Sequence, residues 1–225
     1  MLGNNSDFAL KLFEPKILKR INEDGKRLYV TESGDKYTSV TTALSYLNKK
    51  GIAIWRARVG EKEANRISRQ ASVAGTAVHD IAEKYMLNIL TEENLNPIAW
   101  TTFKTIKPFL DENVDEVYGV ELQMYSDSLK AAGTADLICR YNGKNTILDF
   151  KTSKKRKTRS QIKNYFMQGA AYADMVEQHY DMKIDQIVIL MAVHDSNEPV
   201  VFTEELSEWT PMTRKFFDLY NRGML

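Results

Sequence analysis

The stretch Gly133–Thr152, GTADLICRYNGKNTILDFKT, decides the fold. It contains two apolar segments joined by Asn142-Gly143, a dipeptide typical of a two-residue type I′ hairpin turn. Such a turn fixes the register, because each residue of one strand then has a defined partner in the other. The expected pairs are Tyr141 with Lys144, Cys139 with Thr146, and Asp136 with Asp149.

The two aspartates interrupt strands that are otherwise apolar. Directly opposed residues have Cβ atoms roughly 4.5–5.5 Å apart, and like charges there are destabilising. Asp136 and Asp149 therefore need a cation between them or must share a proton. Lys151 lies two residues beyond Asp149, which puts its amine on the same face of the strand. This arrangement suits metal-assisted attack on a phosphate. The alternative is that Asp136 caps a turn and that Asp149 and Lys151 form an exposed ion pair.

Composition indicates a soluble globular protein. The chain has 225 residues, long enough for one sizeable domain, with 43% apolar and 27% charged residues. No apolar run approaches the roughly 20 residues of a membrane span, and the start, MLGNNSDFALKLF, lacks the pattern of a signal peptide. The single cysteine, Cys139, has no partner for an internal disulfide. We therefore expect a cytoplasmic protein with no membrane partner.

Charge is segregated along a chain whose net charge is only +1. Positive residues concentrate in 56–69 and 151–159, and negative residues in 111–116 and 204–208. A neutral protein with this pattern can still offer a basic groove. The basic residues could therefore contact the phosphates of a nucleic acid. The alternative is that they form an ordinary solvated surface. The candidates are Arg56, Arg58, Lys62, Arg66, Lys154, Lys155, Arg156 and Lys157.

Periodicity places helices before the hairpin. Ser39 is a suitable N-cap for a helix that Gly51 would end. A second helix, over about 53–70, would carry Arg58, Lys62, Arg66 and Arg69 on one face. A third, from about 73–75 to 90, carries His79, although a lone histidine at a helix edge is more often structural. A fourth helix covers about 97–112.

Strands and helices alternate in the rest of the chain. A small hairpin is expected over 27–31 and 36–38, and a strand over 118–125 contains Glu121. After a polar loop, a helix over about 159–180 places Tyr165, Gln168 and Tyr172 on one side. The segment 185–194 is a strand with two buried faces, and 200–203 is an edge strand. Thr210-Pro211 would start a last helix that Gly223 ends.

These residues resemble the PD-(D/E)-x-K nuclease core, through Gly133-x-x-Asp136 followed by Asp149-x-Lys151. Three further features narrow the resemblance to the RecB-like branch: His79 in Gly75-Thr76-x-x-His79, Glu121, and Gln168-x-x-x-Tyr172. The segment from Ser39-Val40-Thr41-Thr42 through Trp55-Arg56-x-Arg58-Val59-Gly60 to His79 is similar to the mitochondrial genome maintenance exonuclease and its phage-encoded relatives. The resemblance covers roughly residues 37–195. Ala135 replaces the family's proline, as is common in this branch.

The resemblance implies a fold and a site. The fold would be an α/β nuclease core with a mixed β-sheet flanked by helices. A single domain, 1–225, would comprise a helical elaboration (37–115) over the active site, the core (116–205) and a C-terminal helix (206–225). Mg²⁺ or Mn²⁺, as one or two ions, would be bound by His79, Asp136, Asp149 and the backbone carbonyl of Phe150. Glu121 would serve a second ion or its water, and Lys151 would position the attacking water.

The implied activity is that of a metal-dependent DNA exonuclease acting on single strands with free ends, in DNA replication, repair or recombination. Tyr165, Gln168 and Tyr172 would contact DNA or brace the site. Partner proteins would come from the same processes, inside a bacterial host if the chain is phage-encoded. The alternatives are a structure-specific endonuclease, a non-catalytic DNA-binding module with a vestigial site, and an α/β domain with accidental motifs.

Overall fold

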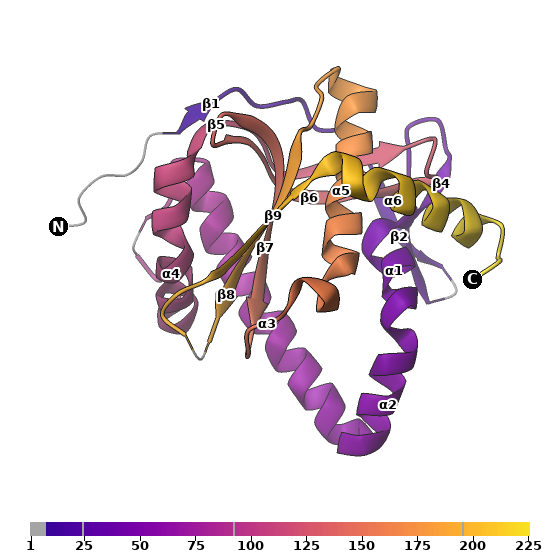
Figure 1. Cartoon of the computed structure of the whole chain (residues 1–225), viewed down its shortest axis with the longest axis horizontal. Helices are drawn as coiled ribbons and strands as arrows, with labels where there is room; N and C mark the ends of the chain where they lie inside the picture. The colour runs from indigo at the N-terminus through magenta and orange to yellow at the C-terminus, as the bar shows by residue number, and fades with distance from the viewer. Residues whose placement is uncertain (1–7, 24, 92, 195) are drawn as a thin grey trace.

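A nine-stranded mixed sheet with helices on both faces forms the centre of the computed structural model (Figure 1), which describes residues 8–23, 25–91, 93–194 and 196–225. Its main path is β2-β3-β4-β6-β7-β8-β9, while β5 pairs with β6 and with β1. The predicted α/β class with a mixed sheet is confirmed. The strands are β1 (Ala9–Leu10), β2 (Lys19–Glu23), β3 (Lys26–Val30), β4 (Lys36–Ser39), β5 (Val114–Ser126), β6 (Ala131–Tyr141), β7 (Lys144–Ser153), β8 (Gln186–Val193) and β9 (Val200–Glu205).

The helices divide between the two faces of the sheet and create two apolar cores. On β8, Ile187, Ile189 and Met191 pack on the side of α5 and α6. Val188, Leu190 and Ala192 pack on the side of α3 and α4. Burial on both faces explains why this strand is apolar at nearly every position. The helices are α1 (Val40–Ser45), η1 (Tyr46–Asn48), α2 (Lys49–Val59), α3 (Glu61–Met86), α4 (Pro97–Asn113), η2 (Arg159–Gln161), α5 (Lys163–Tyr180) and α6 (Leu206–Asn221).

The β6–β7 hairpin has the predicted register. Tyr141 pairs with Lys144 and Cys139 with Thr146, and the paired residues extend to Leu137 and Leu148. The turn residues Asn142 and Gly143 have φ values of 51° and 74°, as a type I′ turn requires. Asp136 and Asp149 are the next residues along the two strands, so they lie where the regular pairing ends.

The N-terminal part of the chain contributes strands to the sheet as well as helices. The predicted 27–31 and 36–38 hairpin is confirmed as β3 and β4, and β2 pairs with β3. β4 then pairs in parallel with β6, which attaches this region to the central hairpin. The region expected to be a helical elaboration therefore begins with a strand of the sheet. Periodicity did not reveal β2, because its side chains are largely exposed and lack an apolar face.

Two predicted helix boundaries are wrong because the chain turns at Gly60 and not at Gly51. Gly51 lies inside α2, and its φ is outside the left-handed region that a C′ glycine adopts. Gly60 has φ 84° and ψ 147°, a conformation that only glycine adopts at low cost. This break divides the helix predicted over 53–70. Beyond it, α3 continues without interruption through 73–75 to Met86.

The break at Gly60 produces a projecting arm. We use arm for α2 together with the first half of α3, which extend from the body as a V (Figure 1). α2 has no buried side chain, and in α3 burial after Ala64 resumes only at Val78. The predicted one-face basic stripe is consequently wrong. Arg58 belongs to α2, whereas Lys62, Arg66 and Arg69 belong to α3 on the other side of the bend.

The last helix begins earlier than its local signals predict. It starts at Leu206, and Pro211 lies inside it, although Thr210-Pro211 is a good N-cap and N1 pair. The reason is tertiary, because Trp209 in the first turn is buried and its indole N–H donates to Glu204 at 3.1 Å. The predicted end at Gly223 is confirmed by its φ of 68°. No helix in the described part of the chain has the length and apolar character needed to cross a membrane.

The environments of Gly51 and Gly169 predict that substitution by alanine has opposite effects on stability at the two positions. An added Cβ at Gly51 meets no atom within 4 Å, so Gly51→Ala should stabilise the protein by about 0.5–1 kcal/mol through helix propensity. At Gly169 a Cβ would lie 2.5 Å from Cγ2 of Ile187, so Gly169→Ala should destabilise it by about 1–3 kcal/mol. Urea denaturation of both variants measures this difference. Destabilisation by Gly51→Ala would instead support the left-handed conformation predicted from sequence.

Candidate metal and active site

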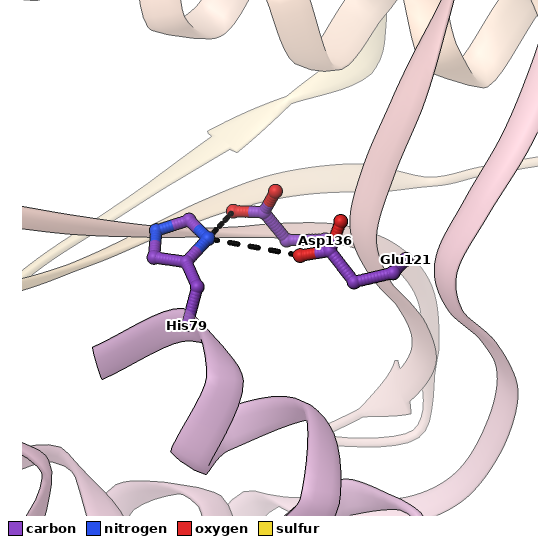
Figure 2. A group of neighbouring side chains, drawn as sticks. All are labelled: His79, Glu121 and Asp136. Atoms are coloured by element: carbon purple, nitrogen blue, oxygen red, sulfur yellow. Dashed lines mark ion pairs between the residues drawn. The ribbon is translucent and has the colours of Figure 1, made fainter. Parts of the chain in front are cut away.

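Three side chains from three elements converge on one point at the end of the central hairpin. His79 comes from α3, Glu121 from β5 and Asp136 from β6, and Figure 2 shows the imidazole facing both carboxylates. Nδ1 of His79 lies 3.8 Å from Oε1 of Glu121 and 3.6 Å from Oδ2 of Asp136. One potential ligand atom from each residue lies within 4.8 Å of the others. The side chains are 26%, 36% and 11% exposed, so the group is reachable from solvent and could hold a metal ion.

The backbone of Phe150 in β7 orients two members of this group. The other ring nitrogen of His79, Nε2, lies 2.9 Å from the Phe150 carbonyl oxygen. In the tautomer that donates this bond, the lone pair of Nδ1 points at the carboxylates. Metal-binding histidines are commonly oriented in this way. The Phe150 amide donates to Oδ2 of Asp136 at 2.9 Å. The carbonyl thus contacts His79, and its predicted role as a metal ligand stays a prediction.

Glu121 reaches the site through an unusual backbone conformation. Its neighbours Val120 and Leu122 pair with Leu137 and Ala135, so Glu121 lies opposite Asp136 in the register. Its φ is 45°, within the left-handed region. That conformation costs a residue with a Cβ roughly 1–2 kcal/mol. A strained residue of this kind is typical of functional sites, where the surrounding fold holds it in place.

Asp149 and Lys151 form an ion pair beside the three-residue group. The Lys151 ammonium contacts Oδ2 of Asp149, and Oδ1 accepts a hydrogen bond from Nε2 of Gln168 at 3.0 Å. Among the described residues, Oδ2 accepts no hydrogen bond of normal geometry in addition to that ionic contact. Asp149 is buried and is not part of the group whose ligand atoms are mutually within 4.8 Å. The two predicted aspartates are therefore neighbours with different partners.

Burial controls the protonation of these acids. It raises the pKa of Asp149 to about 6, because the charge of Asp136 adds to the effect of burial and Lys151 compensates only in part. Burial likewise raises the pKa of Asp136, against the opposing charges of Lys151 and His79. Burial lowers the pKa of Lys151, but the two aspartates outweigh it and the pKa lies above its usual value. A divalent cation would favour the ionised carboxylates.

Helix α5 supports the site from one side. Nζ of Lys151 lies 5.0 Å from the ring centroid of Tyr165, and Nζ of Lys157 lies 5.5 Å from the same centroid. Gln168 and Tyr172 are buried, which favours the predicted bracing role over direct contact with DNA. A Cβ at Gly133 would lie 2.8 Å from a ring carbon of Tyr172, so this strand position requires glycine for close packing.

The basic residues predicted to contact phosphate have different environments. Arg56 pairs with Glu61 across the Gly60 bend, and Arg66 pairs with Glu63 at 2.6 Å, so both guanidinium groups have local acidic partners. Arg156 lies 3.7 Å from Glu198. Lys157 is half-buried against Tyr165. The remaining candidates are exposed side chains of the arm or of the loop after β7: Arg58, Lys62, Lys154 and Lys155.

Sequence reasoning missed three contributions to the site. It did not predict the hydrogen bond from the Phe150 amide to Asp136, the strained backbone of Glu121, or the cation–π contacts of two lysines with Tyr165. None of these has a local signal, because each depends on a partner or conformation imposed by another element. The glycine at position 133, inside an apolar strand, was the available clue to the close approach of α5.

Comparisons with known proteins assign no family. No family model matches the chain, and no curated protein does. Seventeen chains of solved structures match. One, titled "Crystal structure of SSO0001", has a TM-score of 0.33 and 13% sequence identity, and the match covers 65% of this chain and 73% of that chain. A likeness at this level carries no argument about function.

The strain at Glu121 is measurable. We expect Glu121→Gly to be more stable to urea than Glu121→Ala by about 1 kcal/mol, because both variants lack the carboxylate but only glycine adopts φ 45° freely. Gln123, on the same strand, does not have a positive φ and provides the control. There, the glycine variant should be the less stable of the two. Equal or reversed stabilities at position 121 would argue against the left-handed conformation.

Proposed function

We propose that this protein is a metal-dependent DNA exonuclease, which hydrolyses phosphodiester bonds and prefers single strands with free ends. The observation that carries the proposal is the convergence of His79, Glu121 and Asp136 beside the Asp149–Lys151 ion pair. Carboxylates, an imidazole and one lysine in a single partly exposed site are the groups that metal-assisted phosphodiester hydrolysis needs. The resemblance of the same residues to the RecB-like nucleases supports this proposal.

The residues present fit Mg²⁺ or Mn²⁺. Both ions prefer oxygen ligands, and Mn²⁺ also accepts imidazole. His79, Glu121 and Asp136 would hold the ion, and Asp149 lies close enough to Asp136 for their charges to interact. The bound ion would lower the pKa of its water and neutralise phosphoryl oxygens. Burial raises the pKa values of the two aspartates, and a bound cation would favour their ionised forms again.

The other residues would position the reactants. Lys151 would orient the attacking water and offset negative charge that develops on the phosphate. Its ammonium is held between the Asp149 carboxylate and the face of Tyr165. Gln168 fixes the Asp149 carboxylate through the 3.0 Å hydrogen bond. The chain thus supplies a preorganised cation at the reacting phosphate, and such preorganisation is a major source of catalysis.

The preference for single-stranded DNA rests on resemblance and on surface chemistry. Tyr46 of η1 is exposed and Trp55 of the arm is half-buried, and aromatic side chains stack on unpaired bases of any sequence. Exposed basic residues of the arm and of the loop after β7 would contact the backbone phosphates. The loop follows directly on the strand that carries Lys151, which would place its lysines near the scissile phosphate. We place the activity in DNA replication, repair or recombination.

A panel of DNA substrates with and without Mg²⁺ tests the proposed function. We expect degradation of linear single strands, slower degradation of duplex, and protection of circular single strands and of blocked ends. Chelation with EDTA should abolish all cleavage. Rapid cutting of the circle would support an endonuclease on the same site. Binding without cleavage under all conditions would support a non-catalytic DNA-binding module.

Asp149→Asn and Lys151→Ala should separate DNA binding from cleavage. We expect each variant to fold and to bind a linear single strand, while its cleavage rate falls by about 10²–10⁴-fold, the usual effect of losing a catalytic proton-transfer or positioning group. Lys183→Ala is the matched control, because that lysine is exposed and remote in sequence from the site residues. Retained cleavage by either purified site variant would end the assignment.

Metal binding should be visible without any measurement of activity. Mn²⁺ at about 100 times its Kd should stabilise the folded protein by about 2.7 kcal/mol. For a chain of this size, that corresponds to a rise in Tm of roughly 5–10 °C. Asp136→Asn should lose the rise, whereas Glu112→Gln, a change at an exposed acid of α4, should keep it. An equal Mn²⁺ response in wild type and Asp136→Asn would exclude Asp136 as a ligand.

A further inference from the structure

An apolar groove lies where η1, the start of α5 and the second half of α6 meet. Figure 1 shows α6 crossing α5, and the two helices are in contact. The groove has a volume of about 380 Å³, within the range of roughly 300–1,000 Å³ typical of ligand sites. Its floor contains the buried side chains of Met167 and Phe216. Leu47 and Met212 at its sides are 46% and 49% exposed.

The charged side chains that line this groove are basic. Lys163 of α5 and Lys215 of α6 contribute to its walls, and no acidic side chain does so among the described residues. In the described part of the chain, neither lysine makes an ion pair. The two acidic residues of α6, Glu208 and Asp218, pair with Arg159 and Arg222. The groove therefore combines an apolar floor with two positive charges that lack acidic partners within the described chain.

We propose that this groove docks a short, acidic, amphipathic peptide segment of a partner protein. Bulky apolar side chains of the peptide would cover Met167 and Phe216, and its carboxylates would pair with Lys163 and Lys215. Methionine is suited to this role, because its flexible thioether adapts to different apolar anchors. An amphipathic helix in a groove, with anchors at i, i+3, i+4 and i+7, is a common mode of such recognition. The proposal does not depend on the proposed nuclease activity.

The position of the groove gives the docking a consequence. Met167, on its floor, precedes Gln168, which contacts Asp149 of the candidate site. A partner bound here would lie against the helix that also carries Tyr165 and Gln168, without occupying the site. Docking would therefore recruit the protein to its partner and leave the His79–Glu121–Asp136 group accessible.

The proposal can be tested by selecting a random peptide library, displayed on phage, for binding to the whole wild-type protein. We expect the selected sequences to combine glutamate or aspartate with leucine, phenylalanine or another bulky apolar residue. A fluorescein-labelled copy of the most enriched peptide is then titrated with protein and followed by anisotropy. Met212→Glu and the double variant Lys163→Glu, Lys215→Glu should each weaken its binding about tenfold or more. Selection of basic peptides, or of no consistent class, would overturn the proposal.

Matched variants separate this surface from general effects of charge and exposure. Ile98→Glu introduces the same charge at an exposed apolar residue of α4, and Lys104→Glu reverses an exposed lysine of that helix. Both should bind the peptide like wild type. Light scattering provides a further test of the occupant. If the wild-type protein were a dimer and Met212→Glu a monomer, a second copy of the chain would cover the groove. If the Lys163→Glu, Lys215→Glu double variant lost binding to a single-stranded oligonucleotide as much as to the peptide, the surface would be assigned to nucleic acid. This result and the dissociation of a dimer by Met212→Glu would each overturn the proposal.

Discussion

The burial of Asp149 and the near-burial of its neighbour Asp136 form the constraint on which the structure of the candidate site depends. Removing a carboxylate from water disfavours its ionised form, and the proximity of Asp136 and Asp149 adds to this cost. The fold compensates with partners from several elements: the Lys151 ammonium, the Phe150 amide, the Gln168 amide and the His79 imidazole. The position of α3 and α5 relative to the hairpin therefore determines whether the site forms.

The sheet provides the rigidity that this arrangement requires. β6 and β7 pair with β5 and β8, and apolar layers cover both faces of the sheet. The aspartates lie where the regular β6–β7 pairing ends, next to strands fixed on either side. Such support also explains how β5 can hold Glu121 in a strained conformation. Energy lost at one residue is small compared with the stabilisation from the buried strands around it.

The arm has the opposite character. α2 buries no side chain, and helices in water depend mainly on tertiary packing for their stability. We therefore infer that local unfolding begins in the arm before the sheet opens. If the proposed function is correct, the weakly packed projection would admit the polymer while the rigid site holds one phosphate.

The sequence by itself determined the features that depend on neighbouring residues. Asn142-Gly143 determined the hairpin and its register, and the unbroken apolar run of β8 indicated burial on both faces. Tertiary structure decided where local signals competed or were absent. It began α6 before Thr210-Pro211, through the buried Trp209, and turned the Glu121 backbone toward Asp136. The choice of Gly60 over Gly51 for the helix break lay between two glycines with similar local preferences, and the packing of the arm does not explain it. The physical reason is that a turn acts through its own φ preferences, whereas the start of α6 and the Glu121 conformation depend on contacts with residues on other elements.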